Sequence, residues 1–167
     1  MKKYIFVAIF SALLILWIAF IWCNSMQTGA ESGKVSSEVT EKINEVAEPV
    51  LKEPVTEKTV RKSAHFVEYM LLGVLGSLDA VFISYALSRR SALKVSCSML
   101  PTLALAFAVA SVDEFAIQAA TDGRGPSWRD VGIDSAGALT GIAVCVAVFL
   151  LAYYLAGVRQ KKLNLQK

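Results

Sequence analysis

Four long stretches of the chain are rich in apolar residues and almost free of charge. They cover residues 4–23, 64–87, 95–112 and 133–158, and their only acidic residues or histidines are His65, Glu68, Asp79 and Asp134. Each is about 18 residues or longer, which is the length an α-helix needs to cross roughly 30 Å of hydrocarbon. We therefore predict an all-α, integral membrane four-helix bundle in one domain, 1–167, with helices at about 4–23, 64–87, 95–118 and 128–157.

The segment 24–62, between the first two predicted spans, has a different pattern. After a polar exit rich in serine, glycine and glutamine, Val35, Val39, Ile43 and Val46 recur at spacings of three and four. This pattern predicts an amphipathic helix of about three turns, lying on the outer membrane surface or over the outer mouth of the bundle. Pro49 and Pro54 interrupt it, because proline lacks the amide proton that a helix interior needs. A new helix is expected to start near Thr56.

The first apolar stretch has a second interpretation, as a cleaved signal peptide behind Lys2 and Lys3. It is longer than the 7–15 apolar residues typical of such a signal. It also carries Trp17 and Trp22, which suit a membrane anchor. We therefore interpret it as an uncleaved helix.

Composition agrees with a membrane protein, since 55% of the residues are hydrophobic, against 45–50% in ordinary soluble domains. The net charge of +3 is modest, and no nucleic-acid partner is expected. The N-terminus, the 88–94 loop and the tail after Gly157 are basic and contain no acidic residue. The positive-inside rule then predicts that both termini lie in the cytoplasm and that segments 24–62 and 121–132 lie outside. We expect the membrane to be the plasma membrane.

The three cysteines, Cys23, Cys97 and Cys145, fall at different expected depths in the membrane. An odd number of dispersed cysteines argues against a disulfide framework or a metal cluster. We interpret them as small residues that pack in the bundle.

Polar residues recur at the ends of the predicted helices that share the outer face. His65, Glu68 and Tyr69 stand at positions i, i+3 and i+4, so they lie on one helical face. The full set consists of His65, Glu68, Tyr69, Asp113, Glu114, Gln118, Arg124, Asp130 and Asp134. Each charge within the membrane costs about 2.5–3.5 kcal/mol at the bilayer centre and less near the interface. We therefore predict that these residues meet in a polar, ligand-binding pocket that opens outward.

Small residues and caps predict how the helices meet. Gly137 and Gly141 form a GxxxG spacing, and Gly73 and Gly76 lie on the face of the second span that carries His65, so close helix contact is expected. Ser127 followed by Asp130 resembles a capping box, which predicts that the fourth helix begins at this serine. Pro101 is expected to kink the third helix.

A simpler interpretation of the polar set is that its members only cap helices and form salt bridges. Glu68 would then pair with Arg124, and Asp134 with Arg129. Asp79 lies toward the opposite membrane face, where pairing with Arg89 and Arg90 is expected. With one histidine and no zinc-protease spacing, we expect no metal and no cofactor. Acid–base chemistry by His65 is possible, but no motif names a reaction.

Three stretches resemble the VanZ-like family of bacterial membrane proteins: "SMQTGAESGKVS", "RKSAHFVEYMLLGVL" and "DEFAIQAATDGRGPSWRDVGIDSAGALTG". Their order and spacing agree over nearly the whole chain. The resemblance carries the family's pattern onto Lys62, His65, Glu68, Tyr69, Asp113, Glu114, Gln118, Arg124, Asp130, Asp134, Gly137 and Gly141. The chain departs from it at 119–123, where the family usually has a hydrophobic pair followed by proline and glycine.

The resemblance implies a role at the cell envelope, because the founding member is linked to teicoplanin resistance. Our first hypothesis is a non-enzymatic protein whose pocket binds a lipid headgroup or a lipid-linked precursor and lowers susceptibility to glycopeptide antibiotics. The second is an intramembrane hydrolase or transferase acting on an envelope lipid, with His65 and carboxylates as acid, base or metal ligands. A transporter is disfavoured, because apart from Asp79 the polar residues do not continue across the membrane.

Overall fold

The computed structural model describes residues 2–47, 53–87 and 91–165, and within these ranges the chain is helical and contains no strand. The elements are α1 (Lys2–Ser25), α2 (Gly29–Ala47), α3 (Glu57–Ala86), α4 (Ala92–Ser98), α5 (Pro101–Val112), a π-helical turn (Asp113–Ile117), a 3-10 turn (Gln118–Ala120) and α6 (Trp128–Leu165). Four of the described helical stretches are long and apolar enough to cross a membrane. The prediction of an all-α, four-span membrane protein is confirmed.

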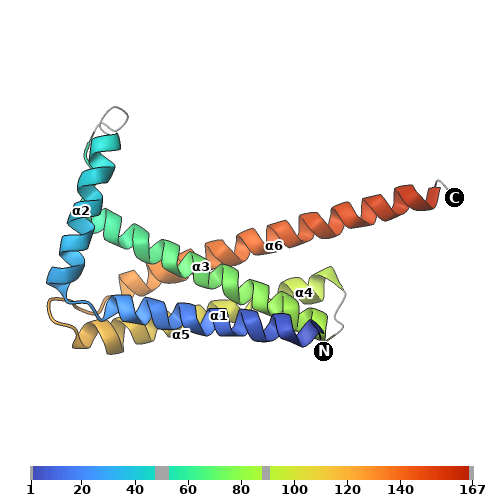
Figure 1. Ribbon diagram of the computed structural model, residues 1–167, viewed down its shortest axis with the longest axis horizontal. Coiled ribbons are helices and arrows are strands. Elements are labelled where there is room, and N and C mark those ends of the chain that lie inside the picture. The colour runs from blue at the N-terminus through green and yellow to red at the C-terminus, as the bar shows by residue number, and fades with distance from the viewer. Residues whose placement is uncertain (1, 48–52, 88–90, 166–167) are drawn as a thin grey trace.

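The spans lie side by side, and α2 lies crosswise at one end (Figure 1). Helix α6 crosses α3, and its second half then extends beyond the other helices. Many apolar side chains on the outside of the spans are exposed in the isolated chain, as expected for surfaces that face lipid.

The third span is interrupted, whereas the sequence predicted one kinked helix. Helix α4 ends at Ser98, and Pro101 occupies the first turn of α5. Proline is favourable at that position, because the first amides of a helix have no partner within it. At its other end, the span widens into the π turn at Asp113–Ile117.

Glycine allows α3 and α6 to touch backbone to backbone. A Cβ placed on Gly137 would lie 2.3 Å from the Phe66 carbonyl oxygen, and one on Gly141 would lie 2.1 Å from the carbonyl oxygen of Met70. From the opposite side, a Cβ on Gly73 would lie 2.2 Å from the Ala138 carbonyl oxygen. No side chain fits at these distances, so the close contact predicted from the GxxxG spacing is present.

Helix α1 packs along α3. Phe6 and Phe10 stack on Phe82, with ring centroids 5.4 and 4.7 Å away. The Ser11 hydroxyl donates to both carboxylate oxygens of Asp79 at 3.0 and 3.1 Å. The predicted partners of Asp79, Arg89 and Arg90, lie outside the described residues.

Helix α2 begins earlier than predicted. The sequence interpretation treated 24–33 as a polar exit, but α2 starts at Gly29, because Thr28 and Glu31 cap it reciprocally through their side chains and backbone amides. The Gly29 amide also donates to the Asp122 carbonyl at 2.8 Å, which joins the start of α2 to the loop before α6.

Helix α3 begins where the sequence predicted. Thr56 is its N-cap and accepts a hydrogen bond from the Thr59 amide. Pro54 lies just before this cap, and Pro49 is outside the described residues.

All three cysteines are free.

Replacing Gly141 with alanine is expected to destabilise the protein, because the new methyl group would clash with the Met70 carbonyl oxygen. Overpacking of this kind costs typically about 1–3 kcal/mol. Gly132→Ala, in the same helix, is the matched control, since nothing lies within 4 Å of its added Cβ. Thermal unfolding in detergent measures both variants, and equal midpoints would contradict the close α3–α6 contact.

Candidate functional site

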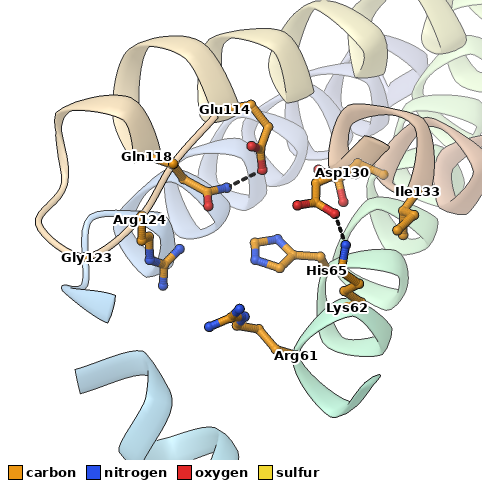
Figure 2. A pocket seen from close by; sticks show the side chains of 11 residues that line it. Arg61, Lys62, His65, Glu114, Gln118, Gly123, Arg124, Asp130 and Ile133 are labelled. Atoms are coloured by element: carbon orange, nitrogen blue, oxygen red, sulfur yellow. Dashed lines mark hydrogen bonds and ion pairs between the residues drawn. The ribbon is translucent and has the colours of Figure 1, made fainter. Parts of the chain in front are cut away.

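Side chains from α3, the π turn, the loop before α6 and α6 itself surround a cavity of about 130 Å³ near one end of the spans (Figure 2). Its lining residues are Arg61, Lys62, His65, Glu114, Gln118, Gly123, Arg124, Gly125, Asp130, Ile133 and Asp134. Six of the nine residues that the sequence predicted for a pocket therefore line one cavity. We call it the polar cavity.

A second cavity of about 230 Å³ adjoins the polar cavity and has a more apolar wall. It lies between the end of α1, one face of α2 and the start of α3, and Val35, Val39 and Val60 contribute to its lining. We call it the α2 cavity. Glu68, a seventh predicted residue, lines it. Arg61, His65 and Arg124 line both cavities, so the two spaces share a wall.

The remaining two predicted residues, Asp113 and Tyr69, are not among the residues that line either cavity. Both side chains are fully buried, with 0% exposure. Asp134, although it lines the polar cavity, is only 1% exposed. The predicted set thus includes side chains within the protein interior as well as cavity-lining ones.

The π turn places Asp113, Glu114 and Gln118 in direct contact. The Gln118 side-chain amide donates to Asp113 Oδ2 at 2.9 Å and to Glu114 Oε1 at 2.7 Å. The Ser25 hydroxyl, at the end of α1, also donates to Asp113 Oδ2, at 2.9 Å. Two carboxylates that would otherwise repel each other are therefore joined by one neutral amide.

The start of α6 is attached to both neighbouring spans. The Ser127 amide donates to Glu114 Oε2 at 2.9 Å, and the Asp130 amide donates to the Ser127 hydroxyl at 3.3 Å, as the predicted cap requires. The Asp130 carboxylate forms an ion pair with Lys62 of α3 (Figure 2). These contacts fix the depth at which α6 enters the bundle.

The salt bridges of the simpler interpretation are not formed among the described residues. Glu68 accepts a hydrogen bond from the Asn24 side chain at 2.9 Å, and its Oε2 lies 3.9 Å from His65 Nδ1. Neither Glu68 with Arg124 nor Asp134 with Arg129 is within ion-pairing distance. The simpler interpretation therefore assigned the wrong partners to Glu68 and Asp134.

Two arginines converge beside His65. Figure 2 shows the guanidinium groups of Arg61 and Arg124 on the same side of the imidazole ring. Burial lowers the pKa of Arg124, and the positive charge of Arg61 lowers it further. The carboxylates of Asp113, Glu114 and Glu68 act on Arg124 in the opposite direction, but among the described residues none lies within ion-pairing distance of either arginine.

Sequence reasoning missed Arg61, although a signal existed. Arg61 stands four residues before His65, so both occupy one face of α3. Asn24 and Ser25 were also missed, because nothing in a polar exit segment indicates which carboxylate each residue will contact.

Comparison with known proteins identifies one similarity. The sequence profile described as VanZ/LLP1 matches residues 10–151, which is most of the chain. No curated protein and no solved structure matches it significantly.

Substituting Gln118 with leucine is expected to destabilise the protein by about 1–3 kcal/mol, because the buried carboxylates of Asp113 and Glu114 would both lose a donor. Gln27→Leu is the control, since Gln27 is exposed and no hydrogen bond of its side chain is found. Chemical denaturation in detergent would compare the two. A Gln118→Leu protein as stable as the control would show that this amide does not support the carboxylates.

Proposed function

Because the chain belongs to the VanZ/LLP1 family and has four helices able to span a membrane, we propose that it is a protein of the bacterial cell envelope that binds an anionic lipid headgroup. The ligand is the headgroup of a membrane lipid or the phosphate portion of a lipid-linked cell-wall precursor. It occupies the polar cavity, and no chemical change of the ligand is required. By holding such a precursor, the protein lowers susceptibility to glycopeptide antibiotics such as teicoplanin.

The observation that carries this proposal is the pair of arginines without a carboxylate partner. Guanidinium groups match the oxygens of phosphate in a planar, often bidentate geometry. Two of them at a site within reach of lipid favour an anion with more than one oxygen. Lys62 is less available for this role, because Asp130 already pairs with it.

The α2 cavity supports a lipid rather than a free anion. It begins at the shared wall of Arg61, His65 and Arg124 and continues along the valines of α2 and α3. A ligand with a charged head and an apolar stem would place the head at the arginines and the stem along these valines. Sulfate or phosphate alone would leave that apolar surface unused.

The alternative is an intramembrane hydrolase or transferase that acts on the same lipid. One observation favours it: His65 Nδ1, at the shared wall, lies 3.9 Å from Oε2 of Glu68, which lines the α2 cavity. A histidine beside a carboxylate can carry a proton during catalysis.

For the orientation, we propose that both termini are cytoplasmic, because the start of α4 and the basic end of α6 lie at the end of the structure opposite α2 (Figure 1). In a cysteine-free background, Glu45→Cys is expected to react with a membrane-impermeant thiol reagent in intact cells. Asn164→Cys is expected to react only after lysis. The reverse pattern would place the cavities on the cytoplasmic side and remove the basis for an envelope role.

Arg124→Gln is expected to weaken lipid binding, because hydrogen bonds to charged groups contribute about 1.5–3 kcal/mol. Purified protein in nanodiscs would be titrated with a polyprenyl diphosphate and with phosphatidylglycerol. Arg129→Gln is the matched control, since Arg129 is exposed, is the second residue of α6 and lines neither cavity.

Equal affinity of the two variants would contradict an anion site at Arg124. Mass spectrometry of the retained lipid separates the two functions. An unchanged lipid mass after prolonged incubation supports binding, whereas loss or transfer of a headgroup supports the enzyme.

A further inference from the structure

One half-buried imidazole and two buried carboxylates, from three spans, converge beside the polar cavity. His65 of α3, Asp113 of the π turn and Asp134 of α6 each offer one nitrogen or oxygen, and these atoms all lie within 4.8 Å of one another. The residues are far apart in the sequence, so the fold alone brings them together. This separation explains why their spacing resembles no metal-binding motif.

These three atoms form a triangle whose size suits a metal ion. A point at its centre is no more than about 2.8 Å from each atom, and zinc binds imidazole nitrogen and carboxylate oxygen at about 2.0–2.2 Å. Each side chain would therefore have to move by less than about 1 Å. Small rotations about side-chain bonds provide such a movement without displacing the helices.

The carboxylates lack the partners that buried charges require. Neither oxygen of Asp134 has a hydrogen-bond partner, although this side chain is only 1% exposed. Asp113 has 0% exposure, and its Oδ1 has no hydrogen-bond partner. His65 Nδ1 has no hydrogen-bond partner either. Burial disfavours the charged form of Asp134, and the neighbouring carboxylates of Asp113, Glu114, Asp130 and Glu68 disfavour it further. An unpaired carboxylate in such surroundings is strongly unfavourable unless a cation or a proton neutralises it.

Asp113 accepts hydrogen bonds of the kind that commonly orient a metal ligand. Ser25 and Gln118 both donate to Oδ2, which orients the carboxylate and leaves Oδ1 free. Outer hydrogen bonds of this kind fix the direction of a ligand and commonly change metal affinity by about 10–100-fold.

We propose that His65, Asp113 and Asp134 bind a single divalent transition-metal ion, of the Zn²⁺ or Mn²⁺ class. One imidazole with two carboxylates suits these ions better than Mg²⁺ or Ca²⁺, which prefer oxygen ligands only. Three protein ligands leave at least one coordination position open. Because His65 and Asp134 line the polar cavity, that position faces the cavity, where a water molecule or a ligand oxygen can occupy it.

The test uses the metal ion alone and is independent of the headgroup proposal. Full-length protein in detergent is stripped with EDTA and titrated with ZnCl₂ and, separately, MnCl₂ by calorimetry. We expect one ion per chain and a higher thermal unfolding midpoint. Asp134→Asn and Asp113→Asn are expected to weaken binding by about 100-fold or more, and Ser25→Ala by about 10–100-fold.

Two matched controls separate coordination from general charge. Asp79→Asn removes a buried carboxylate near the far end of α3, and Asp122→Asn removes an exposed one in the loop before α6. Both are expected to bind metal as the unmodified protein does. Binding that is weak in every variant, or equally strong in every variant, would overturn the site.

X-ray absorption of the zinc-loaded, unmodified protein does not depend on how the variants fold. We expect a first shell of nitrogen and oxygen that includes one imidazole. A shell without imidazole, or one that contains sulfur, would refute the assignment.

Discussion

The contact between the backbones of α3 and α6 determines the positions of almost everything else. Phe66, whose carbonyl lies against Gly137, is the neighbour of His65, and Asp134 stands one turn before that glycine. The same close contact that brings the two helices together thus brings the histidine and the carboxylate to one level. Further along, Gly73 and Gly141 keep the helices in contact, so the register between them is set at several points.

Polar contacts near this α3–α6 contact join the other elements to these helices and to one another. Lys62 holds the start of α6, Glu114 accepts from Ser127, and Ser25 connects the end of α1 to Asp113. Each contact joins residues from different spans, so the polar end of the bundle is also its most cross-connected part. In lipid, where apolar association contributes little between helices, such contacts and close packing supply the specificity.

The four spans, the caps at Thr56 and Ser127 and the glycine contact were predictable, since each depends on a local pattern. The interruption between Ser98 and Pro101 and the early start of α2 were not, because each depends on which cap or turn competes best with a continuing helix. The π turn was the feature that was hardest to predict from the sequence. It brings Asp113 into contact with Gln118, five residues later, whereas an α-helix turns such residues to different faces.

Most of the candidate site followed from placing helix ends at one level, but the roles within it did not. Sequence reasoning grouped nine polar residues, and it had no basis for separating buried Asp113 and Asp134 from residues that line the cavities. Burial depends on side-chain packing between spans, which periodicity does not encode. Arg61 was missed for a related reason, since a basic residue at a membrane interface usually needs no partner in the protein.

The wall shared by the two cavities has a thermodynamic consequence. His65 contacts both spaces and also offers a nitrogen to the triangle with Asp113 and Asp134. The proposed cation and the proposed lipid would therefore both contact this one imidazole. Linkage makes any effect of one on the other reciprocal: if a cation strengthens the binding of an anionic lipid by some factor, the lipid strengthens the binding of the cation by the same factor. Occupancy of the site would then depend on the concentrations of both the cation and the lipid. Each of them, measured alone, would bind more weakly than in the presence of the other.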